Sequence, residues 1–117
     1  MQNNEFIYTT ISIRNYDIDA MGYVNNIVYI RWFEDLRHVF LEKYLPFEKM
    51  LEMDLTPVLA KTVVDYLKPL HIHHKPEGRI RVNKMGHTKW ILYLEIIVGE
   101  TVHCKGLQTG YFMNLKT

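Results

Sequence analysis

The segment Asn26–Tyr44 constrains the fold of this 117-residue chain more than any other. Apolar residues recur there at intervals of three and four, which is the spacing of one face of an α-helix. The set comprises Ile27, Ile30, Phe33, Leu36 or Arg37, and Phe40, widened by Val28, Tyr29, Trp32 and Val39. An apolar face this broad exceeds that of a surface helix. We therefore expect a sheet to wrap around it.

The sequence on either side of this helix is typical of strands joined by turns. β-Branched and aromatic residues predict a first strand at residues 6–14. Pro46 marks the end of the helix, and residues 47–53 predict another short helical turn. Four further strands are expected at residues 56–67, 79–85, 89–98 and 101–115, with hairpin turns at Gly86-His87 and Gly99-Glu100. Gly106 and Gly110 in the last strand predict bulges or close packing.

This order of elements predicts an α+β fold. One strand, a long helix and four hairpin-joined strands are compatible with a five-stranded antiparallel sheet around a central helix. At this length we expect a single domain covering residues 1–117. A domain of this size leaves a sheet edge and one end of the helix partly exposed, so we expect the chain to associate with itself.

Composition excludes several classes of function. A net charge of +1 offers no basic face for nucleic acid. No apolar run is long enough to cross a bilayer, and the first five residues lack the pattern of a signal peptide. The single cysteine, Cys104, cannot form an internal disulfide. We expect a cytoplasmic protein without nucleic-acid or membrane partners.

Two carboxylates and a glycine stand immediately before the long helix, at Asp17, Asp19 and Gly22. A carboxylate facing a helix N-terminus can act on a carbonyl carbon or on water, while the helix N–H groups hold the carbonyl oxygen. Asn25 or Asn26 can cap the helix. Aspartate is also common in turns and at helix starts without any catalytic role. The spacing alone leaves both interpretations open.

Metal chemistry is not expected. No third or fourth oxygen ligand follows Asp17 and Asp19 at the interval of a calcium loop. His71 and His73 share a strand face, yet two imidazoles are too few for structural zinc, and His103 lies far away in sequence. We interpret the histidines at 71, 73 and 74 as exposed loop residues.

Other catalytic arrangements are also unsupported. Adjacent strand residues point to opposite faces, so His103 and Cys104 should not act together as base and nucleophile. The sequence has no G-x-S-x-G nucleophile elbow and no glycine-rich phosphate loop. The expected strands also carry a modest set of basic residues: Arg14, Arg79, Arg81, Lys84 and Lys89. We interpret this set as a solvated face. Alternatively, it could contact the phosphates of coenzyme A.

Residues 17–29 read D-I-D-A-M-G-Y-V-N-N-I-V-Y. This segment closely resembles the D-x-D-x-x-G-H-V-N-N-x-x-Y segment of hotdog-fold acyl-CoA thioesterases related to 4-hydroxybenzoyl-CoA thioesterase. The resemblance continues through residues 31–34 and returns at residues 63–69. It implies a hotdog fold and a homodimer or homotetramer. It also implies that the protein hydrolyses an acyl-CoA thioester. The reaction would need no metal, and no cofactor besides the coenzyme A of the substrate.

The resemblance also implies roles for individual residues. Asp19 matches the catalytic aspartate, as nucleophile or general base, and the backbone N–H of Asn26 matches the group that polarises the thioester carbonyl. Gly22 matches the loop glycine that lets the backbone approach the substrate. Asn25 and Tyr29 fall in the substrate-binding part of the motif.

The chain departs from the family pattern at two places near this motif. Tyr23, also expected to contact substrate, stands where many members have histidine. Residues 70–78 form a longer segment than the short glycine-aspartate turn of the family. Asp17 is expected to shape the loop rather than react.

Two other functions remain open on the sequence. A hotdog dehydratase or hydratase usually needs a histidine paired with an acid, and no histidine precedes this helix. A non-catalytic acyl-CoA-binding protein could keep the fold without the chemistry. The acyl group is equally open, since aromatic and short or medium aliphatic groups both suit an aromatic-rich pocket.

Overall fold

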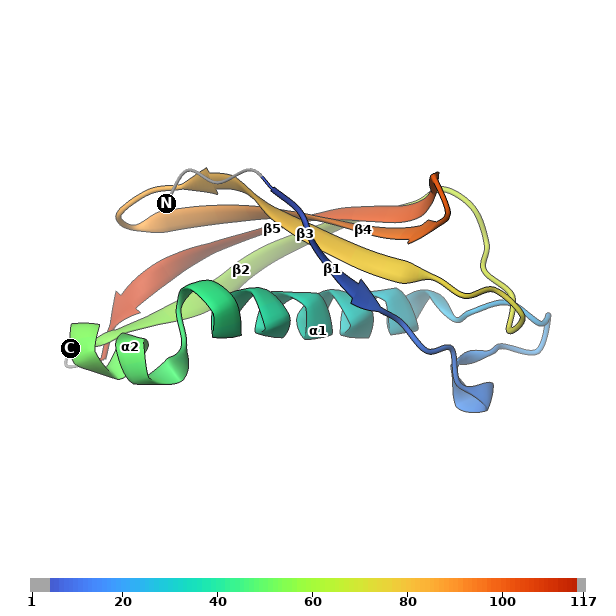
Figure 1. Ribbon diagram of the computed structural model, residues 1–117, viewed down its shortest axis with the longest axis horizontal. Helices are drawn as coiled ribbons and strands as arrows, with labels where there is room; N and C mark the ends of the chain where they lie inside the picture. The colour runs from blue at the N-terminus through green and yellow to red at the C-terminus, as the bar shows by residue number, and fades with distance from the viewer. Residues whose placement is uncertain (1–4, 116–117) are drawn as a thin grey trace.

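The computed structural model describes residues 5–115 and consists of one antiparallel sheet curved over a long helix (Figure 1). In chain order the elements are β1 (Ile7–Thr10), η1 (Asn15–Asp17), α1 (Asn26–Tyr44), α2 (Phe47–Met53), β2 (Leu55–Tyr66), β3 (Glu77–Met85), β4 (Lys89–Val98) and β5 (Thr101–Asn114). The strand order across the sheet is β1-β3-β4-β5-β2. The predicted α+β arrangement of five strands around one helix is confirmed.

The bounds of α1, α2 and β4 agree with the sequence prediction, whereas the first strand is shorter than predicted. It ends at Thr10, which pairs with Glu77 of β3. The residue just before β3 is Pro76, whose backbone oxygen accepts a hydrogen bond from Ile11 N–H at 3.1 Å. Proline has no N–H to return to the ladder, so the pairing stops there. The chain then turns through η1 toward the start of α1.

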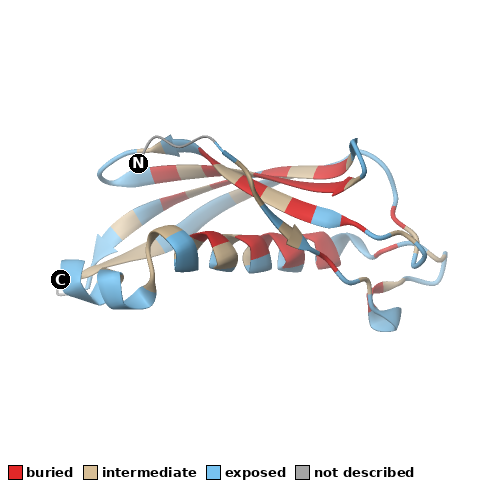
Figure 2. Cartoon of the chain, in the orientation of Figure 1, coloured by how far each residue is buried: buried red, intermediate tan, exposed pale blue. Residues whose placement is uncertain are grey.

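One face of α1 packs against the sheet. Its buried residues are Val28, Tyr29, Trp32, Phe33, Leu36 and Phe40. Ile27 and Ile30 were expected on this face, but they are 65% and 39% exposed. The sheet covers the helix from one side, as the buried residues in Figure 2 indicate, and these two isoleucines lie outside the covered stripe.

Two glycines in β5 allow close packing, Gly106 against α1 and Gly110 against a side chain of β4. A Cβ added at Gly106 would lie 2.6 Å from the ring of Phe33, and one at Gly110 would lie 2.0 Å from the ring of Trp90. The pairing of β2 with β5 also shifts register between Leu59 and Lys61, opposite Gly110. The close packing predicted for these glycines is therefore confirmed, whereas the extra residue of the register shift, Ala60, lies in β2.

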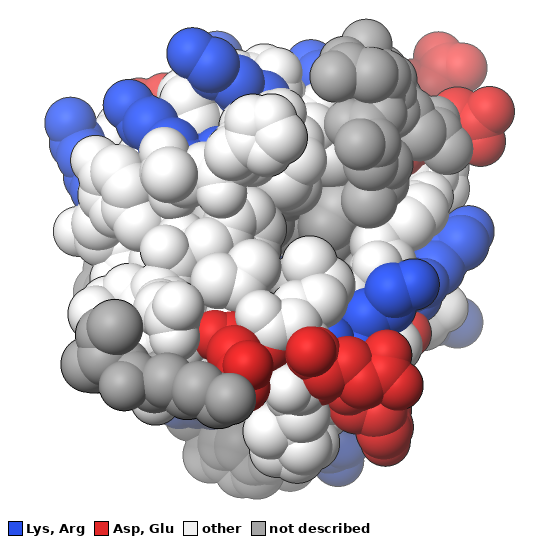
Figure 3. Space-filling model, turned by 90° about the vertical axis from the view of Figure 1, so that its left-hand side faces the viewer, with Lys and Arg blue, Asp and Glu red and all other residues white. Residues whose placement is uncertain are grey.

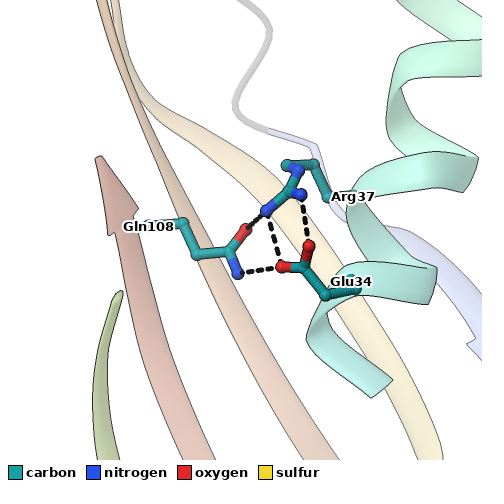
Figure 4. Close-up of polar contacts among 3 residues, drawn as sticks. All are labelled: Glu34, Arg37 and Gln108. Carbon is teal, nitrogen blue, oxygen red and sulfur yellow. Dashed lines mark hydrogen bonds and ion pairs between the residues drawn. The ribbon is translucent and has the colours of Figure 1, made fainter. Parts of the chain in front are cut away.

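A buried polar network joins α1 to β5 (Figure 4). Gln108 is fully buried on the helix-facing side of β5. Its Oε1 accepts a hydrogen bond from Arg37 Nη1 at 2.8 Å, and its Nε2 donates to Glu34 Oε2 at 3.0 Å. Arg37 and Glu34 complete the set with an ion pair. Both polar atoms of the buried Gln108 amide thus have a partner, as the low-polarity interior requires.

Within residues 5–115, no helix has the length and apolar character needed to span a bilayer. The end-on view in Figure 3 shows basic and acidic side chains in separate small groups, with no continuous basic surface on that face.

Candidate active site

A cavity of about 300 Å³ lies at the N-terminal end of α1. Its lining includes Asp19, Tyr23, Asn26 and Tyr29, which are four of the predicted site residues, together with Tyr66 from the end of β2. Gly22 and Asn25 do not line it. Cavities of similar size lie beside Asp17 and beside the C-terminal half of α1, but neither contains the predicted set.

The Asp19 carboxylate is held by the loop that follows it. Asp19 Oδ1 accepts hydrogen bonds from the backbone N–H groups of Met21, at 2.9 Å, and Tyr23, at 3.1 Å. Gly22 adopts a φ of 85°, which lets the chain turn tightly around the carboxylate. The loop therefore fixes the position of an exposed carboxylate at the rim of the cavity.

The start of α1 is fixed by backbone and side-chain hydrogen bonds. Asn25 is the N-cap, because its Oδ1 accepts a hydrogen bond from Ile27 N–H at 3.1 Å. Val24 N–H donates to Leu70 O and Asn25 N–H donates to Asp17 O, both at 2.8 Å. Val28 N–H also donates to Asn25 O, at 2.9 Å, and the helix dipole is positive at this end. The first helical residue, Asn26, lines the cavity.

Two tyrosines form the wall opposite this loop. The rings of Tyr29 and Tyr66 meet edge to face at 5.5 Å, and the Tyr66 hydroxyl donates to Asn26 O at 3.1 Å. Burial raises the pKa of Tyr29 to about 12 and also raises the pKa of Tyr66, with the Cys104 thiol adding to both effects. Both phenols therefore remain protonated near neutral pH.

Tyr66 was not among the residues predicted for the site. It lies in residues 63–69, which resemble the family only at the level of the fold. No pattern in the sequence predicts its contact with Asn26, because the contact depends on where β2 ends relative to α1.

Asp17 and Asp19 border different cavities. Asp17 is only 2% exposed, its Oδ2 accepts a hydrogen bond from Arg14 N–H at 2.9 Å, and its Oδ1 lies 3.5 Å from Arg31 Nη1. Its backbone oxygen accepts the bond from Asn25 N–H. These contacts support the structural role expected for Asp17, since it ties the loop to the start of α1.

The histidines are closer together than the sequence suggested. The rings of His71, His73 and His74 lie 4.5–5.5 Å apart, and the ring of His103 lies 5.4 Å from that of His74. His71 and His74 are only half-exposed, so the prediction of exposed loop residues is wrong for these two. The pairing of β2 with β5 places residue 103 beside the loop, where its backbone oxygen accepts bonds from Leu67 and Lys68 N–H.

Within the described residues, the neighbouring histidines and Cys104 form neither a metal site nor a reactive thiol. Within residues 5–115, no set of three or more His, Cys, Asp and Glu side chains is arranged to hold a metal ion. Burial, with a further contribution from Asp65, raises the pKa of Cys104 to about 12. A thiol that stays protonated at neutral pH is a poor nucleophile.

The predicted basic set is only partly a solvated face. Arg79 is half-buried, pairs with Glu95, and lies 4.4 Å from the ring centroid of Phe6. Arg81 stacks over Phe6 and Tyr93 on the same side of the sheet. Neither arginine lines the cavity at the start of α1.

Comparison with known proteins gives a family match and several similar folds. The family described as Thioesterase-like superfamily matches residues 13–117. No curated protein matches the chain significantly. Among solved structures, the chain is similar to YbaW, a probable thioesterase from Escherichia coli, with a TM-score of 0.85 and 23% identity over 93% of this chain and 84% of that one.

Two further structures share the fold. A DHNA-CoA thioesterase from Staphylococcus aureus has a TM-score of 0.81 and 20% identity over 96% of this chain and 76% of that one. A thioesterase from Thermus thermophilus, complexed with coenzyme A and Zn, has a TM-score of 0.81 and 21% identity over 96% of this chain and 86% of that one.

Proposed function

The chain belongs to the thioesterase-like superfamily, as the sequence predicted, and we propose that this acyl-CoA thioesterase hydrolyses its substrate at the cavity beside α1. The observation that carries the proposal is that this cavity brings the Asp19 carboxylate together with the first residue of a long helix. The products are a free carboxylic acid and coenzyme A.

The thioester carbonyl oxygen would lie against the N-terminus of α1. Negative charge develops on this oxygen in the transition state, and the Asn26 N–H and the helix dipole would stabilise it. Losing one donor of this kind typically costs about 3 kcal/mol of activation free energy. The position of Asn26 in the cavity lining supports this assignment.

Asp19 would supply the reacting carboxylate by one of two routes. As a nucleophile it attacks the carbonyl carbon, the thiolate of coenzyme A leaves, and water hydrolyses the resulting anhydride. As a general base it takes a proton from the attacking water. Both hydrogen bonds to Asp19 from the loop end on Oδ1, which supports Oδ2 as the reacting atom.

The acyl group would be aromatic or a short or medium aliphatic chain. Three tyrosine rings, Tyr23, Tyr29 and Tyr66, line the cavity and would contact it. Gly22 and Asn25 would act indirectly, since Gly22 turns the loop and Asn25 caps α1. Thiol release from a panel of benzoyl-, hexanoyl- and decanoyl-CoA would identify the preferred class.

The active unit would be a homodimer, with a homotetramer as a further assembly. β2 pairs with β5 on one side only and presents twelve residues along the sheet edge. Its exposed apolar residues include Val58, Leu59 and Val63. A long apolar edge strand is a template for pairing with a second copy, and Tyr66 at its end would bring the partner close to the cavity.

The central test is the variant Asp19→Asn, which keeps the size of the side chain and removes its charge. We expect it to lose at least about 10³-fold in kcat with its thermal unfolding unchanged, because the group that attacks or activates water is absent. Asp54→Asn, at the far end of the molecule, is the control. Equal turnover by Asp19→Asn and the wild type would refute the assignment. Tight acyl-CoA binding without thiol release by the wild type would instead indicate a binding protein.

A further inference from the structure

Tyr66 links the sheet to the first turn of α1. It is the last residue of β2 and pairs with Cys104 of β5, so its backbone belongs to the sheet. Its hydroxyl donates to the backbone oxygen of Asn26, forty positions away in sequence. This hydrogen bond connects the sheet to the residue whose N–H faces the substrate in the proposed reaction.

The same side chain has a second contact that fixes its direction. The Tyr66 ring packs edge to face on Tyr29, one turn along α1 from Asn26, with the ring planes 72° apart. Two contacts on one side chain define its position better than the hydrogen bond alone. Tyr66 also lines the cavity that contains Asp19.

We propose that Tyr66 is a positioning residue for thioester hydrolysis, whose hydroxyl holds the first turn of α1 so that the Asn26 N–H meets the carbonyl oxygen. The inference rests on the function proposed above. Tyr66 acts through Asn26, because its hydroxyl bonds the backbone oxygen of the residue that supplies the N–H.

The physical argument concerns the orientation of the Asn26 N–H. An N–H group stabilises an oxyanion only when it is aimed at the place where the charge develops, and small displacements reduce the effect strongly. A hydrogen bond to the carbonyl of the same residue restrains its backbone.

Tyr66→Phe is the informative variant, because it removes the hydroxyl and keeps the ring on Tyr29. We expect kcat to fall about tenfold while KM stays within about twofold, since the lost hydrogen bond affects mainly the transition state. Tyr111→Phe is the matched control: Tyr111 is 44% exposed, as Tyr66 is, and lies on β5 away from the cavity.

Two inert analogues separate positioning of the N–H from general damage to the site. One is a ketone in which a methylene replaces the thioester sulfur. The other is a thioether of coenzyme A, in which a methylene replaces the thioester carbonyl. Both carry the hydrocarbon group of the better substrate, benzoyl-CoA or hexanoyl-CoA. We expect Tyr66→Phe to bind the ketone about threefold more weakly and to bind the thioether as the wild type does.

The outcomes distinguish this inference from the proposed function. If Asp19→Asn is inactive and Tyr66→Phe behaves as Tyr111→Phe does, the role of Tyr66 is overturned and the proposed function stands. Equal weakening of ketone and thioether binding by Tyr66→Phe would show general damage to the site and also overturn it. If Asp19→Asn keeps full activity, the proposed function fails, and the role of Tyr66 in it fails as well.

Discussion

The ring of His71 lies 4.5 Å from the ring of Tyr23, and the two residues also form an isolated β-bridge. Tyr23 N–H in turn donates to the Asp19 carboxylate. The loop between β2 and β3, which includes His71, therefore supports the loop that carries the proposed catalytic acid.

His71→Ala tests this support. Without the imidazole, the Tyr23 ring loses a packing partner and the loop around Asp19 becomes less ordered, so we expect KM to rise about threefold to tenfold. Steady-state kinetics with the best acyl-CoA substrate would measure this. His87→Ala, in the exposed turn between β3 and β4, is the control. Identical KM values for the two variants would contradict a supporting role for His71.

The stability of the fold should fall at mildly acidic pH. His74 Nδ1 accepts a hydrogen bond from His71 N–H at 2.9 Å, which requires an unprotonated Nδ1. Burial lowers the pKa of His74 below its ordinary 6.5, and the facing imidazoles of His73, His103 and His71 lower it further. Below pH 6.5 the unfolded chain therefore binds a proton that the folded chain does not.

The stabilising contribution of neutral His74 is thus present above pH 6.5 and is lost as the pH falls through the folded pKa. Urea unfolding between pH 7.5 and 5 would measure the decline in the free energy of unfolding. His74→Asn keeps an acceptor without titrating in this range, so its decline should be smaller. His87→Asn should decline as the wild type does. A steeper decline for His74→Asn would contradict this explanation.

Gly106→Ala should destabilise the fold. The added methyl would lie 2.6 Å from the Phe33 ring, so helix and sheet would have to separate locally. Overpacking of a core typically costs about 1–3 kcal/mol in the free energy of unfolding. Thermal denaturation would measure it, with Thr109→Ala, a half-exposed position on the same strand, as the control. An unchanged melting temperature for Gly106→Ala would show that the contact relaxes without cost.

Val63→Lys tests the proposed dimer. Lysine on an edge strand opposes pairing with another strand, and twofold symmetry would bring two lysines near each other. We expect the dissociation constant of the dimer to rise at least about tenfold, as measured by sedimentation equilibrium. Lys61→Arg, which keeps the charge on the same strand, is the control. A wild-type protein that is monomeric at all concentrations would contradict the dimer itself.

The sequence predicted the helix, most of the strands and their arrangement because periodicity and turn residues are local properties. It did not reveal the contact between Tyr66 and Asn26, which depends on where β2 ends relative to α1. Nor did it reveal the approach of His103 to His74, which arises only when β2 pairs with β5. The exposure of Ile27 was mispredicted for a similar reason. An apolar face on a helix does not specify which part of it the sheet will cover.

The polar network of Glu34, Arg37 and Gln108 has a consequence for how this fold can vary. A helix packed only by apolar side chains can rotate or slide slightly against its sheet with little loss of energy. Here such a displacement would leave a charge or an amide without its partner inside the protein. We therefore expect the residues at these three positions to covary among relatives. This covariation would be independent of the chemistry at Asp19.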